Sequence, residues 1–127
     1  MSLTDVQRVE LQTQILVGMG RLARAINHLE KWLVLNKADA AYDDLEDRRI
    51  LLEGDFHLVR ARLAEIKRAE GQFAPPDETR MATIRALSDE VAELIRAQAT
   101  ADVMLSMVVK ALAIVAEVRK VGASATV

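Results

Sequence analysis

Histidines and carboxylates are the first candidates for chemistry in this chain of 127 residues. The sequence contains two histidines, His28 and His57. A di-iron helical bundle needs two Glu-x-x-His motifs and further glutamates that face inward. Glu53 precedes His57 by four residues and Glu30 follows His28 by two, so neither histidine has this spacing. We therefore predict no metal site and no cofactor.

Possible nucleophiles also lack a catalytic setting. The chain has no cysteine, which excludes disulfides and thiolate metal sites. None of the serines lies in a nucleophile elbow, the strained strand-to-helix turn of many hydrolases. Gly18 and Gly20 lie inside a helical heptad run and do not follow a strand, so they form no phosphate-binding loop. The sequence predicts no catalytic residues and a protein that is not an enzyme.

The charge and its distribution exclude further classes. The net charge is −2, and the basic cluster in the middle of the chain is interleaved with acidic residues, so we expect no nucleic-acid binding. The cluster consists of Arg60, Arg62, Lys67 and Arg68, with Glu65 and Glu70 among them. We expect no signal peptide and no transmembrane span, because the N-terminus lacks a basic and apolar leader and charges interrupt every long apolar stretch. The expected location is the cytoplasm or a particle assembled inside the cell.

The elements that would position these residues are long helices. Hydrophobic residues make up 51% of the chain, aromatic residues only 3%, and there are two prolines, which favours an aliphatic all-α fold. We predict a single domain over 1–127, with helices at about 4–35, 40–70 and 77–121, a loop at 71–76 and a frayed tail at 122–127. Apolar residues recur at heptad spacing in each helix, as in a coiled coil. The predicted architecture is an antiparallel bundle of three long helices.

A polar layer is expected within this bundle. If the second and third helices pair about the loop at Pro75, Arg49 falls opposite Gln98. Both interrupt otherwise apolar seams, and a shared polar layer of this kind fixes helix register. The same kind of alignment for the first two helices places Gly20 beside Gly54, which predicts a close backbone approach; the alternative is that these glycines only weaken their helices.

The C-terminal stretch from Ala101 to Val121 is apolar around most of its circumference. Its polar side chains, apart from the closing Arg119 and Lys120, fall on a stripe about 80° wide. The predicted pairing leaves residues 110–121 projecting past the bundle unless the chain breaks near Thr100 and folds back as a fourth helix. No glycine or proline marks a break there, so we expect the third helix to be extended and its overhang to be covered by another subunit.

The expected function follows from this overhang. We predict a non-enzymatic structural or assembly protein that self-associates through its C-terminal helix, as a homo-oligomer or with another helical protein. The predicted interface residues are Leu105, Val108, Val109, Leu112, Ile114, Val115 and Val118. Two alternatives are a peripheral protein whose apolar end inserts into a membrane and a small ligand-binding bundle that uses the layer of Arg49 and Gln98.

Overall fold

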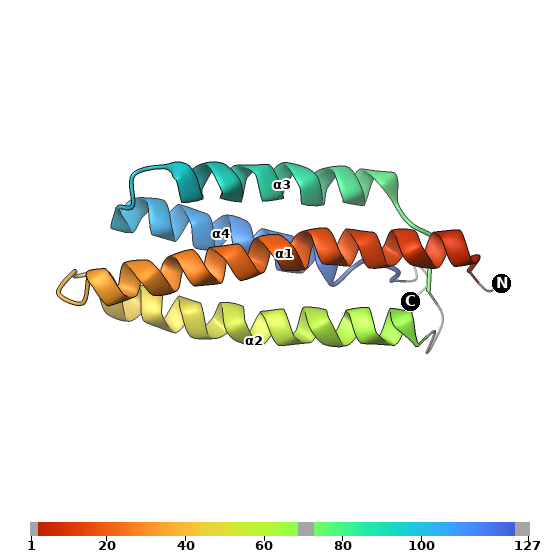
Figure 1. The fold of residues 1–127 in the computed structure, drawn as a ribbon, viewed down its shortest axis with the longest axis horizontal. Coiled ribbons are helices and arrows are strands. Elements are labelled where there is room, and N and C mark those ends of the chain that lie inside the picture. The colour runs from red at the N-terminus through yellow and green to blue at the C-terminus, as the bar shows by residue number, and fades with distance from the viewer. Residues whose placement is uncertain (1–2, 69–72, 124–127) are drawn as a thin grey trace.

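The computed structural model describes residues 3–68 and 73–123, and the regular elements within them are all α-helices (Figure 1). α1 spans Asp5–Leu35, α2 Tyr42–Lys67, α3 Glu78–Arg96 and α4 Ala101–Val118. The prediction of an all-α helical bundle is confirmed, with four helices in place of three. Parts of the predicted second helix, of the loop at 71–76 and of the frayed tail fall on residues 69–72 and 124–127, which lie outside the described residues.

The long third helix expected from the sequence is broken. The backbone of Ala97 is extended, with φ −72° and ψ 167°, and the hydroxyl of Thr100 caps the new helix by accepting from the Val103 amide at 3.2 Å. The preference for continuity was wrong because it weighed only local propensity, which differs among good helix formers by less than about 0.7 kcal/mol per residue. Each aliphatic side chain that the reversal buries contributes about 1.5–3 kcal/mol.

The fourth helix occupies the place that the prediction gave to the third. α4 packs against α1, α2 and α3, whereas α2 and α3 make no contact with each other within the described residues. Lys110 and Glu117, which belong to the polar stripe of α4, face α3, where they pair with Glu90 and Arg80 at 3.1 and 3.5 Å. The expected projection of residues 110–121 past the bundle is therefore wrong.

Polar side chains fix both ends of α4. At its N-terminal end, the indole nitrogen of Trp32 on α1 donates to the carbonyl of Ala99 at 3.2 Å. At its C-terminal end, the Arg62 guanidinium donates to the carbonyl of Val121 at 2.9 Å and that of Arg80 to the carbonyl of Lys120 at 2.7 Å. Cations near the end of a helix satisfy its last carbonyls and complement its dipole. These contacts hold α4 in register with α1, α2 and α3.

One glycine permits close packing of α4 against α1. A methyl group at Gly18 would lie 2.5 Å from Cγ2 of Val118 and 3.2 Å from Cγ2 of Ile114. At Gly20 and Gly54 an added methyl group would meet nothing within 4 Å. The predicted close approach of Gly20 to Gly54 is therefore wrong, and the close approach in this bundle is between α1 and α4.

We expect Gly18→Ala to lower the free energy of unfolding by about 1–3 kcal/mol, because the added methyl group overpacks the core despite its better helix propensity. Gly20→Ala is the matched control, since the same substitution two residues away has open space and should raise stability by about 0.5–1 kcal/mol. Urea denaturation followed by circular dichroism measures both. A Gly18→Ala protein as stable as Gly20→Ala would contradict this packing.

Candidate functional site

The predicted polar layer of Arg49 and Gln98 does not form. Arg49 on α2 binds two carboxylates of its own helix: it donates from Nη1 to Glu53 at 2.9 Å and from Nε to Glu46 at 3.1 Å. Gln98 is exposed in the linker between α3 and α4. The break at Ala97 removes Gln98 from the helical seam, and α4 separates α2 from α3.

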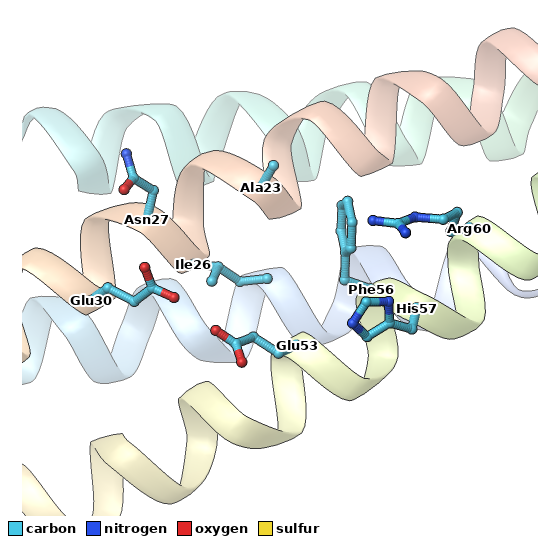
Figure 2. A pocket seen from close by; sticks show the side chains of 8 residues that line it. All are labelled: Ala23, Ile26, Asn27, Glu30, Glu53, Phe56, His57 and Arg60. Atoms are coloured by element: carbon cyan, nitrogen blue, oxygen red, sulfur yellow. The ribbon is translucent and has the colours of Figure 1, made fainter.

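A groove of about 290 Å³ lies between α1 and α2 (Figure 2). Its floor is apolar, and two carboxylates, Glu30 from α1 and Glu53 from α2, approach each other across it. A hydrogen bond between them raises the pKa of Glu30 and lowers that of Glu53, which Arg49 also stabilises in its charged form. The remaining side chains that line the groove are Ala23, Ile26, Asn27, Phe56, His57 and Arg60.

This groove can hold a proton between two helices. Two carboxyl groups with diverging pKa values resemble an acid–base pair. Two of the groups around them, however, already have partners in the protein: Arg49 binds Glu53 at 2.9 Å, and the Arg60 guanidinium lies 5.4 Å from the centre of the Phe56 ring. The groove is also open to solvent and not enclosed. The arrangement therefore couples α1 to α2 through a shared proton, a feature that the sequence analysis missed.

The predicted interface residues of α4 fall into two groups. Val108, Ile114, Val115 and Val118 are buried in the core of the single chain. α1, α2 and α3 cover them because α4 folds back onto the bundle. The prediction that they form an interface with another molecule was therefore wrong. Leu105 and Leu112 are partly buried, and Val109 is 56% exposed. Only this second group can contact another molecule without unfolding the bundle.

Two leucines of α2 are exposed in the same way. Leu51 and Leu58 are 52% and 53% exposed. They lie seven residues apart, and each directly precedes a buried residue: Leu51 precedes Leu52, and Leu58 precedes Val59. The sequence analysis did not single them out, although this second heptad stripe beside the core seam was visible in the sequence. They mark an apolar surface of α2 that the protein's own core does not use.

The exposed and partly exposed aliphatic residues of α2 and α4 lie on neighbouring helices. The two helices are packed neighbours and begin at the same end of the bundle (Figure 1). Arg62 of α2 binds the carbonyl of Val121, and counting back along both helices from this bond places Leu51 level with Lys110, beside Val109. We name this surface the α2–α4 face and define it by Leu51, Leu58, Leu105, Val109 and Leu112.

Metal sites, membrane spans and similarity to known proteins give no further indication of function. Across residues 3–68 and 73–123, no cluster of histidine, aspartate and glutamate could hold a metal ion. Among the described helices, none has both the length and the hydrophobicity needed to cross a bilayer. No protein-family model matches the sequence, and no curated protein or solved structure shows significant similarity to it.

The shared proton predicts a dependence of stability on pH. Folding raises the pKa of Glu30 and lowers that of Glu53, so the hydrogen bond from protonated Glu30 to ionised Glu53 stabilises the protein most between the two pKa values. It is lost as pH rises through the raised value and as pH falls through the lowered one. Glu30→Gln donates an amide hydrogen to Glu53 at any pH. We expect the Glu30→Gln protein to be more stable than wild type at neutral pH by a few tenths of a kcal/mol, because the contact is partly solvated. Near pH 4.3, which is about the ordinary pKa of glutamic acid, we expect the two proteins to be equally stable.

Glu53→Gln is the control, because it removes the carboxylate that Arg49 binds and should lower stability at neutral pH. Denaturant unfolding of the three proteins at both pH values measures these differences. If the Glu30→Gln protein followed the wild-type pH profile, the shared proton would be disproved.

Proposed function

We propose that this protein is a non-enzymatic structural or assembly subunit that self-associates through the α2–α4 face. The observation that carries the proposal is the exposure of aliphatic side chains on two adjacent helices: Leu51, Leu58 and Val109 are each more than half exposed. Contiguous apolar surface of this kind is typical of protein interaction sites. The face keeps part of the surface predicted from the sequence and adds α2 to it.

The non-enzymatic part of the proposal is supported by the groove between α1 and α2. Its carboxyl groups bind each other and Arg49, and its aromatic ring is covered by Arg60. A catalytic group must reach a substrate atom within hydrogen-bonding distance. Here Arg49 and Arg60 are partnered within α2, and the two carboxyl groups interact across α1 and α2, which favours a structural role.

We expect Val109→Asp and Leu51→Asp each to weaken self-association at least about tenfold, equivalent to 1.4 kcal/mol, because each buries a charge at the interface. Both side chains are already exposed in the single chain, so its helicity and melting temperature should change little. Val9→Asp is the matched control: Val9 is 59% exposed but lies on α1. Sedimentation velocity across the micromolar range measures the association.

Wild-type protein that stays monomeric across that range would overturn self-association. Equal weakening by Val9→Asp would instead show that the effect comes from added negative charge and not from the α2–α4 face.

A further inference from the structure

The charges around the α2–α4 face are divided between its two ends. Because α2 and α4 begin at the same end of the bundle, their first turns bring acidic residues together. The exposed acidic side chains in and just after these turns are Asp43, Asp44, Asp47 and Asp102, of which Asp44 pairs with Arg48 at 3.1 Å. The exposed basic side chains at the opposite end are Lys67, Arg68, Arg119 and Lys120. The face therefore has an acidic end, an apolar middle and a basic end.

This division sets the direction in which two copies can meet. A two-fold interface uses the same surface on both molecules, so that surface must be complementary to itself. In a parallel pair the acidic ends face each other and so do the basic ends, which is repulsive. In an antiparallel pair the acidic end of each copy faces the basic end of the other, which is attractive.

The α2 part of the middle of the face suits the antiparallel arrangement as well. Gly54 lies between Leu51 and Leu58, and it has open space around it for a closely approaching neighbour. Reversing one copy about the midpoint of Gly54 and Asp55 places Leu51 of each copy opposite Leu58 of the other. The arrangement also brings Asp55, which follows Gly54, close to its own copy, a like-charge approach that the apolar contacts and the charged ends must outweigh.

We propose that the protein forms a two-fold dimer in which the α2–α4 faces of two copies pack antiparallel, the acidic end of each against the basic end of the other. This inference rests on the proposed self-association and adds its partner, a second copy of this chain, and its geometry. The side chains that define the pairing are Leu51 and Leu58 in the middle and the charged groups at the two ends.

Cysteine cross-linking tests the direction, and the absence of native cysteine makes the experiment clean. In the antiparallel dimer a mixture of Leu51→Cys and Leu58→Cys proteins should form a disulfide-linked dimer at least about tenfold faster than either protein alone. The control is Val9→Cys, mixed with each of the two, which should cross-link only at the background rate because Val9 lies on α1.

Charge variants test the complementarity of the ends. Asp47→Lys with Asp102→Lys makes both ends basic, and Arg119→Glu with Lys120→Glu makes both ends acidic. Each double variant alone should lose at least about tenfold in association at low salt, and an equimolar mixture should recover it because opposite ends attract again. Circular dichroism of each variant verifies that the helices remain folded.

The outcomes separate this inference from the function on which it rests. If wild-type protein is monomeric, both fail. If it is dimeric and Leu51→Cys alone cross-links faster than the mixture, self-association stands and the antiparallel geometry is overturned. A wild-type dimer that neither cross-links through these positions nor responds to Val109→Asp overturns the geometry together with the α2–α4 face.

Discussion

Burial of the last helix is the constraint on which the arrangement of the other three depends. α4 buries Met104, Met107, Ile114 and Val118 completely, and like α1 it packs against each of the other three helices in the described part of the chain. The turn at Ala97–Thr100 exists because a helix with so much apolar surface cannot remain in water. Gly18, the Trp32 indole and the Arg62 and Arg80 guanidinium groups then fix where α4 lies.

The same constraint explains which parts of the fold could be predicted from the sequence. Heptad spacing located α1 and α2, and the spacing of Thr4 and Gln7 agrees with the capping box that starts α1, since these signals are local. The break before Thr100 could not be found in this way. Its local signal is one capping threonine among alanines, and what decides it is contact with residues more than sixty positions away, such as Trp32.

The errors at the candidate site come from that one missed break. With a continuous third helix, Gln98 lies in a seam opposite Arg49 and Val115 lies on an uncovered overhang. With the helix folded back, Gln98 is in the linker, Arg49 binds only carboxylates of its own helix among its described partners, and Val115 is in the core. Val109 keeps its predicted exposure, because it lies on the side of α4 that faces away from α1 and α3.

The part of α4 that remains exposed is a consequence of how many neighbours a helix can have in a four-helix bundle. Three neighbours cover most of its circumference but leave one stripe, and on an amphipathic helix that stripe is polar. On α4 the polar residues Lys110 and Glu117 face α3 instead, where they form ion pairs. The stripe beside α2 is left with Leu105, Val109 and Leu112, and α2 adds Leu51 and Leu58. These aliphatic residues do not belong to the centre of the core, and they are the basis of the proposed contact between molecules.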